Sequence, residues 1–186
     1  MVFNKTNIKE IIEINPMVFG DNRGYFFESY NQQLFLENGI DVEFVQDNQS
    51  FSHQGVLRGL HFQKPPFTQG KLVSVVQGAV MDIAVDLRGG SPTFGNHVSV
   101  VLSAEKQNML WIPPGFAHGF LTLEDNTIFQ YKCTKYYNKN SEATLLWNDS
   151  QLKIDWNIEN PVISEKDKIG IPLKQLEIYF DYNDTY

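Results

Sequence analysis

Residues 71–87 read KLVSVVQGAVMDIAVDL, and this stretch decides the fold. Apolar side chains recur at every second position from Met81 to Leu87, with Asp82 and Asp86 among the residues between them. A period of two predicts a β-strand with one face in a core, and Gly78 marks a turn between two such strands. Similar alternation predicts further strands, in residues 44–51, 58–63, 97–102, 118–123 and 126–133.

Only two segments have the pattern of a helix. Asn31 is placed to cap a short helix through Leu36 that Gly39 closes, and residues 172–180 are compatible with a second. Many short strands with so little helix predict a mainly β fold, an antiparallel sandwich or jelly-roll barrel. A barrel of this kind would enclose a ligand pocket lined by inward-facing residues.

Length and composition narrow the class of protein. The 186 residues predict a single domain spanning 1–186. The lone Cys133 cannot form an internal disulfide or a cysteine-based zinc site, which favours a reducing compartment such as the cytoplasm. No apolar run approaches the ~20 residues of a membrane span, and the N-terminus lacks the pattern of a signal peptide. The net charge of −7 disfavours a nucleic-acid partner, so an anionic ligand would need a local basic pocket.

Polar residues crowd faces of the predicted strands that should be buried. Alternation puts Gln46, Asn48 and Ser50 on one face, and His61 shares a face with Gln63. Buried polar groups need partners, and a ligand can be that partner. The plain alternative is that each polar residue is a hydrogen-bonded core group or a surface ion-pair partner. We assign His53 and His97 to that alternative, and composition alone makes Asp167 a loop acid.

Together, His61, Tyr131, Lys71, Arg23 and Arg58 offer a base, an acid and cations for an anion, without a nucleophile elbow or a phosphate-cradling glycine loop. This set fits proton transfer next to a carbonyl. An imidazole is neutral often enough at physiological pH to accept a proton, and Lys71 is our candidate for stabilising the resulting enolate.

Cupin barrels often hold a metal with two histidines and a glutamate from one stretch and a third histidine from a PxGxxH stretch. The second stretch is present as PPGFAH, residues 113–118, and ends in His118. The first is absent, because Gln63 stands where a second histidine would be and no acid follows through Lys71. We therefore predict a site without metal or cofactor.

Several motifs in order closely resemble one family, the dTDP-4-dehydrorhamnose 3,5-epimerases, which are metal-free cupins. The motifs are DNRGYFFESY, FVQDNQSFS, GVLRGLHFQ, QGKLV, AVDLRGGSPTFG, LWIPPGFAHGF, YKCTKYY and SEKD, and they cover most of residues 19–170. The resemblance implies a cytoplasmic enzyme of dTDP-rhamnose biosynthesis that inverts C3 and C5 of dTDP-4-dehydro-6-deoxy-D-glucose without a redox cofactor.

The resemblance also implies residue roles: His61 as general base, Asp167 as its dyad partner and Tyr131 as general acid. Tyr137 looks like the aromatic residue that stacks on thymine. The implied substrate contacts are Arg23, Glu28, Gln46, Asp47, Asn48, Arg58, Lys71, His118, Glu142 and Lys166. Arg23 and Glu28 would reach the active site of a neighbouring subunit, which implies a homodimer with exchanged strands.

The sequence departs from the family's pattern at Ser74, Ala79 and Lys139, where Arg, Glu and Pro are common, and we expect these changes to affect pocket polarity. Three alternatives stay open: a mono-epimerase or ketoisomerase acting on the same keto-sugar class, a metal-dependent cupin such as a dioxygenase, and a non-catalytic sugar-binding barrel.

Overall fold

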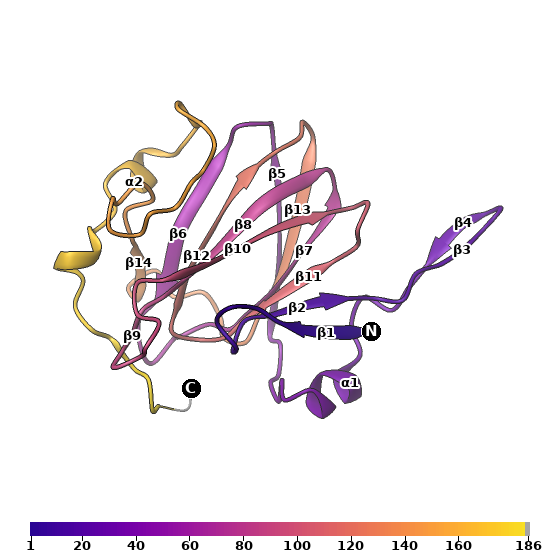
Figure 1. Ribbon diagram of the computed structural model, residues 1–186, viewed down its shortest axis with the longest axis horizontal. Helices are drawn as coiled ribbons and strands as arrows, with labels where there is room; N and C mark the ends of the chain where they lie inside the picture. The colour runs from indigo at the N-terminus through magenta and orange to yellow at the C-terminus, as the bar shows by residue number, and fades with distance from the viewer. Residues whose placement is uncertain (185–186) are drawn as a thin grey trace.

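The computed structural model describes residues 1–184, in which two antiparallel sheets pack face to face as a jelly roll (Figure 1). The six-stranded sheet has the order β1 (Val2–Lys5), β2 (Ile12–Asn15), β11 (Met109–Ile112), β7 (Lys71–Gln77), β13 (Thr127–Cys133) and β5 (Gln46–Ser52). The five-stranded sheet has the order β10 (His97–Ser103), β8 (Ala79–Asp86), β12 (Phe116–Thr122), β6 (Leu57–Gln63) and β14 (Glu142–Thr144). This confirms the predicted fold class, with the two main sheets separate and two further pairs of short strands in the described residues.

The expected strands lie where alternation predicted them, but the prediction for β8 was wrong in one respect. All eight of its residues are buried, not only one face. Val80 and Ala84 lie in the core between the sheets, whereas Met81, Ile83 and Val85 pack against a second core on the outer side. A strand covered on both sides has no solvent face, so the aspartates within it need internal partners.

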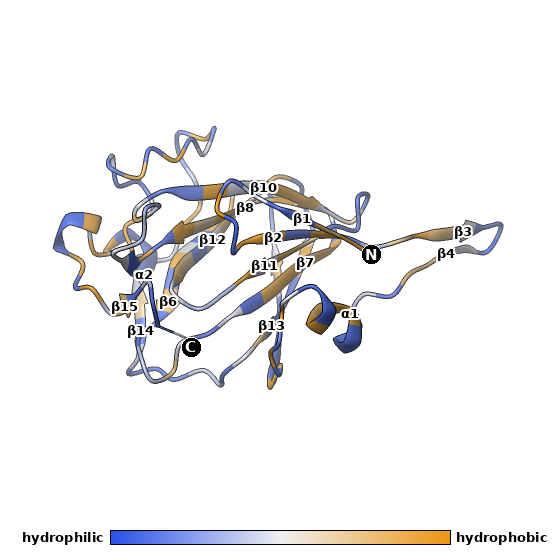
Figure 2. Cartoon of the chain, turned by 60° about the horizontal axis from the view of Figure 1, so that its bottom comes forward, coloured by the Kyte–Doolittle hydropathy of each residue, from blue (hydrophilic) through white to orange (hydrophobic). Residues whose placement is uncertain are grey.

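The C-terminal third of the chain covers that outer side. It contributes Leu145, Leu152, Trp156 and Phe180 to the second core, and Figure 1 shows it, from orange to yellow, beside the five-stranded sheet. Figure 2 shows hydrophobic residues along the strands of both sheets. A third core, which includes Phe35, covers part of the outer face of the six-stranded sheet.

The first helix follows the prediction. α1 (Gln32–Glu37) starts at Asn31, whose Oδ1 accepts a hydrogen bond from the Leu34 N–H at 3.2 Å, and Gly39 follows it with a φ of +82°. None of the helices in the described part of the chain is long and apolar enough to cross a membrane.

Two predictions near the C-terminus were wrong. Residues 172–180 form only a 3₁₀ turn, Leu173–Gln175, before β15 (Phe180–Asp181) pairs in parallel with β9 (Arg88–Gly89). Packing of this segment on the outer core overrides its helical spacing. The SEKD motif is not a loop, because it forms α2 (Glu165–Lys168), capped by Ser164.

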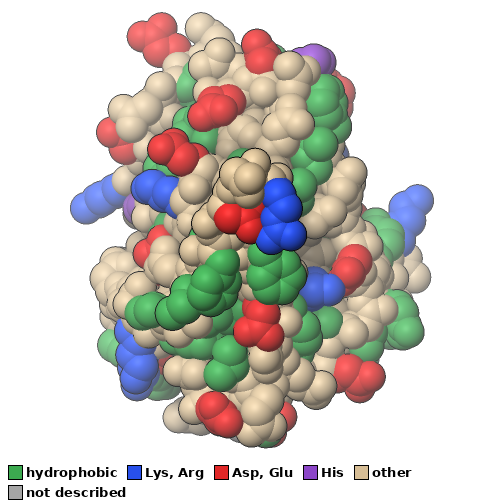
Figure 3. Space-filling view, turned by 90° about the vertical axis from the view of Figure 1, so that its right-hand side faces the viewer, with side chains coloured by type: hydrophobic (Ala, Val, Ile, Leu, Met, Phe, Trp, Pro, Cys, Tyr) green, Lys and Arg blue, Asp and Glu red, His purple; other side chains and the backbone are tan. Residues whose placement is uncertain are grey.

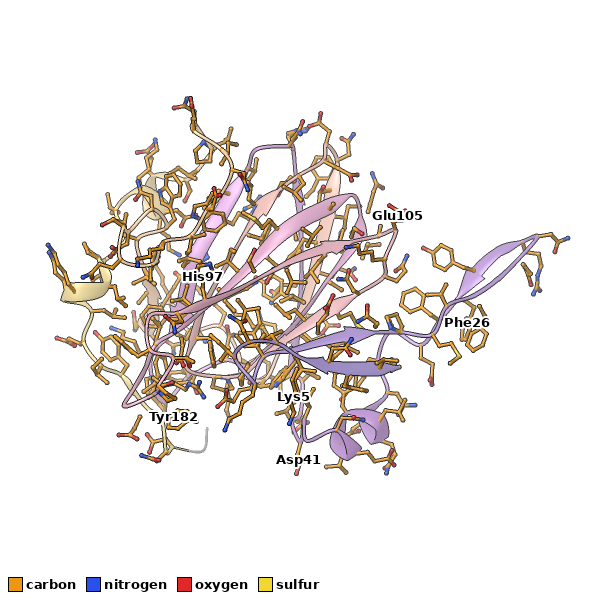
Figure 4. The ribbon with its side chains drawn as sticks, in the orientation of Figure 1. Lys5, Phe26, Asp41, His97, Glu105 and Tyr182 are labelled. Atoms are coloured by element: carbon orange, nitrogen blue, oxygen red, sulfur yellow. The ribbon has the colours of Figure 1, made fainter. Side chains whose placement is uncertain are left out.

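A hairpin of β3 (Phe19–Asp21) and β4 (Gly24–Phe26) projects from the body of the molecule (Figure 1). Phe26, which is 68% exposed, lies well out along it (Figure 4). Seen from the hairpin's side, hydrophobic side chains are exposed around a neighbouring basic and acidic pair (Figure 3). Large apolar side chains in solvent are typical of a contact surface.

Candidate active site

Two histidines face each other across neighbouring strands. β6 and β12 pair antiparallel, with His61 directly opposite His118. Beside this pair the strands approach so closely that a Cβ on Gly59 would lie 2.6 Å from the Cα of Gly119. Gly59 also has a φ of +131°, a conformation that residues other than glycine rarely adopt. These two glycines therefore explain how the strands bring both imidazoles to one cavity.

His61 is hydrogen-bonded to a carboxylate that α2 supplies. Its Nε2 lies 2.6 Å from Oδ1 of Asp167, which is 3% exposed. The Gly59 N–H donates to Oδ2 at 3.3 Å, and the Asp167 N–H donates to Oγ of Ser164 at 3.2 Å. Burial by itself would raise the pKa of Asp167, but these contacts, above all that with His61, lower it overall. An ionised Asp167 thus fixes the ring of His61.

A tyrosine reaches the same cavity from the opposite sheet. Tyr131 lies on β13, beside β7, and its ring centroid is 6.0 Å from Nζ of Lys71. Burial raises the pKa of the Tyr131 hydroxyl, an effect that Cys133 reinforces and Arg58 opposes. The phenol therefore stays protonated at neutral pH and can act as a proton donor.

The sequence analysis missed Asp82 as a site residue. It lies on β8, is fully buried, and its Oδ2 is 2.8 Å from Nε2 of His118. Among the described residues, its Oδ1 has no hydrogen-bond partner. Burial raises the pKa of Asp82, while His118 and Lys71 oppose that rise. A signal was available, because an aspartate inside the apolar run AVMDIAV needs a buried partner.

The cavity between the sheets has two adjoining parts. The larger, about 560 Å³, is lined by polar residues from both sheets and from α2: Arg58, His61, Lys71, His118, Tyr131, Lys166 and Asp167. The smaller, about 150 Å³, shares His61, Lys71 and Tyr131 and adds Gln46, Asn48, Gln63, Tyr137 and Glu142. Three residues thus lie where the two parts meet.

The smaller part contains an organised polar cluster. Glu142 accepts a hydrogen bond from Oη of Tyr137 at 3.0 Å and forms an ion pair with Lys166. Burial would raise the pKa of Glu142, but Lys166 and Tyr137 lower it overall. The Tyr137 N–H donates to Oε1 of Gln46 at 3.0 Å. The exposed Tyr137 ring is thereby held at the mouth.

Three predicted contacts lie outside this cavity. Asp47 alternates to the outer face of β5, where Lys132 Nζ donates to its Oδ2 at 2.9 Å. Arg23 is on the projecting hairpin and pairs with Asp21, while Glu28 accepts from Asn31 Nδ2 at 3.1 Å.

The departures from the family pattern also fall elsewhere. Ser74 lines a groove of about 440 Å³ beside Tyr25 and Gln130, and this groove does not include His61. Ala79 is buried at the start of β8. The groove shares Asn48 and Tyr131 with the cavity, so an effect of Ser74 on pocket polarity stays a prediction.

The remaining histidines lie apart from the cavity. His53 is exposed near Asp125, with Nδ1 3.7 Å from Oδ1, and His97 lies on β10 (Figure 4). Across residues 1–184, no three or more His, Cys, Asp or Glu side chains group in a way that could hold a metal ion.

Comparison with known proteins agrees on one family. A family model described as dTDP-4-dehydrorhamnose 3,5-epimerase matches residues 5–175. The chain is 54% identical over 167 residues to a dTDP-4-dehydrorhamnose 3,5-epimerase of Shigella flexneri, an alignment that covers 89% of this chain and 92% of that protein.

Solved structures show the same likeness. A dTDP-6-deoxy-D-glucose-3,5-epimerase of Legionella pneumophila, in complex with dTDP-4-keto-L-rhamnose, has a TM-score of 0.94 and 46% identity and covers 98% of this chain and 99% of its own. A 3'-monoepimerase of Streptomyces bikiniensis, in complex with dTDP-quinovose, has a TM-score of 0.87 and 31% identity. The match covers 92% of this chain and 87% of that chain.

Proposed function

The chain belongs to the dTDP-4-dehydrorhamnose 3,5-epimerase family, and from this premise we propose that it inverts C3 and C5 of dTDP-4-dehydro-6-deoxy-D-glucose to give dTDP-4-dehydro-L-rhamnose. One observation carries the proposal: His61 bonded to a carboxylate, a protonated Tyr131 and the half-buried Lys71 line one cavity. The enzyme is an isomerase, and the epimerisations leave the oxidation state of the sugar unchanged.

His61 is the general base. The C4 carbonyl acidifies the hydrogens on both C3 and C5, so one base can serve both carbons. An ionised carboxylate only accepts hydrogen bonds, so Nε2 of His61 carries the hydrogen directed at Asp167. Nδ1 is then the nitrogen that takes the proton from the sugar, and Asp167 stabilises the resulting imidazolium.

Lys71 stabilises the enolate. Proton removal places negative charge on O4, and an ammonium group in a cavity from which substrate has expelled water interacts with that charge more strongly than it would in water. Lys71 borders both parts of the cavity, next to the base and the acid.

Tyr131 completes inversion by protonating the enolate carbon from the face opposite His61. The two residues come from opposite sheets, which supports delivery from opposite sides of a sugar bound between them. The raised pKa of Tyr131 keeps its proton in place until the basic carbon takes it.

The polar residues around this centre bind the nucleotide. Arg58 and Lys166 supply the local positive charge that a diphosphate-linked sugar needs, and His118 offers a ring nitrogen to a sugar hydroxyl. Gln46, Asn48 and Glu142 offer polar contacts in the smaller part, and Tyr137 provides a face on which thymine stacks.

We further propose a homodimer in which the β3–β4 hairpin and the segment that follows it carry Arg23 and Glu28 to the partner's cavity. The hairpin's exposed Phe19, Tyr25 and Phe26 support this assembly, because they would be buried by it. If so, mixing equal amounts of an Arg23→Ala variant and a His61→Ala variant should restore about a quarter of wild-type sites, because about half of all dimers are then heterodimers and each heterodimer has one intact site of two. No recovery after subunit exchange would refute the shared site.

We also propose that the protein is located in the cytoplasm.

NMR of the product formed from dTDP-4-dehydro-6-deoxy-D-glucose in D₂O tests the activity. Inversion with deuterium at both C3 and C5 is the expected result. Inversion at C3 alone would identify a mono-epimerase, the rival that the similarity to the 3'-monoepimerase structure favours. If deuterium entered neither C3 nor C5, the protein would not be an epimerase of this sugar.

A further inference from the structure

We propose that Asp82 is a positioning residue for this reaction: its carboxylate orients His118 and provides the negative charge beside which Lys71 holds its ammonium group. This inference rests on the proposed function. Asp82 lies in the middle of β8, at 0% exposure, with Oδ2 bonded to His118 and Oδ1 without a hydrogen-bond partner among residues 1–184.

The bond to Asp82 determines which nitrogen His118 offers to the cavity. Because the carboxylate accepts only, Nε2 of His118 carries the hydrogen, and Nδ1 is left with a lone pair for a sugar hydroxyl. Burial lowers the pKa of His118, and Asp82 opposes that shift. The Phe129 ring stacks beside the imidazole at 6.1 Å, which restricts it further. Asp82 and Phe129 therefore fix one orientation of the ring.

Lys71 needs a counter-charge because burial lowers its pKa. The acidic groups that oppose this lowering of the Lys71 pKa are Cys133 on β13, Asp82 on β8 and Glu142 on β14. Burial raises the pKa of Cys133, so it remains a neutral thiol at neutral pH. Glu142 already bonds to Lys166 and Tyr137, which share its charge.

The other groups around the cavity do not supply that charge. Asp167, the other carboxylate nearby, is bonded to His61, and Tyr131 is protonated. His61 and His118 can contribute only positive charge. Asp82 is therefore the carboxylate with an oxygen still available to balance the ammonium of Lys71.

A comparison within β8 separates this role from ordinary burial. Asp86 lies on the same strand at 0% exposure, but Arg88, Ser91 and Thr93 donate to its two oxygens at 2.6–2.9 Å. Asp86 is thus a saturated structural carboxylate, outside both parts of the cavity. It provides a matched control of the same residue type on the same strand.

The test compares Asp82→Asn with Asp86→Asn by measuring kcat and KM across pH. Without the Asp82 charge, the pKa of Lys71 should fall further, so the ammonium group is lost at lower pH. The alkaline limb of kcat should move down by about one pH unit, the smaller end of what a neighbouring charge shifts. At neutral pH kcat should fall roughly tenfold to a hundredfold, as for other orienting partners, with dTDP binding nearly unchanged. Asp86→Asn should lower the thermal midpoint but leave the pH profile in place.

An alkaline limb that stays in place in folded Asp82→Asn protein would overturn the inference. If that variant does not fold, ¹⁵N NMR of the wild-type protein decides instead: His118 should carry its hydrogen on Nε2, and the opposite tautomer would overturn the role. Wild-type protein without deuterium entry at C3 or C5 would instead refute the proposed function, so the two failures are distinguishable.

Discussion

Asp167→Asn tests the His61–Asp167 dyad most directly. The substitution keeps the size of the side chain but removes the charge 2.6 Å from Nε2 of His61. A hydrogen bond to a charged group contributes about 1.5–3 kcal/mol, and the contact strengthens when His61 becomes an imidazolium. At about 1.36 kcal/mol per tenfold change in rate, kcat should fall roughly 10- to 150-fold. KM should change little, because Asp167 contacts the base.

The assay measures the rate at which deuterium enters C3 and C5, monitored by NMR at saturating substrate concentration. Glu165→Gln is the matched control: it removes the same charge from the same helix, but Glu165 is exposed and pairs only with Lys168 among the described residues, so its rate should equal that of wild type. Melting curves establish that both variants are folded. A folded Asp167→Asn enzyme whose rate is within twofold of wild type would refute the dyad.

Three further predictions concern the same centre. His61→Ala should abolish deuterium entry at both carbons while dTDP still binds, as measured by calorimetry, and full exchange would remove His61 from its role. The Tyr131→Phe variant should still exchange hydrogen for deuterium but should no longer invert the carbons, because His61 can still remove a proton and return one to the same face of the sugar. Unchanged inversion at both carbons would mean that another residue is the acid. The lowered pKa of Asp167 contributes stability above about pH 4 that disappears as the pH falls through the folded-state value. The difference in unfolding free energy between wild type and Asp167→Asn should therefore shrink below pH 4 in urea titrations, and a difference independent of pH would contradict the shift.

The strands and the short capped helix were predictable because their signals are local. Alternation in residues 71–87 follows from the two-residue period of a strand, and Asn31 caps α1 through its own side chain. The local signals failed where a distant segment decided the outcome. The outer face of β8 is buried by residues from 145 onward, and the same packing keeps residues 172–180 from forming a helix.

The sequence by itself determined the family and, through its motifs, the candidates His61, Tyr131 and Asp167. Only the tertiary structure decided how they meet: Asp167 lies 106 positions from His61 and comes within 2.6 Å because Ser164 caps α2 beside β6. The structure likewise placed Asp82 against His118, 36 positions away, and turned Asp47 outward. A local pattern records which face a side chain takes on its own strand, but which groups share a buried cavity depends on the pairing of strands far apart in the chain.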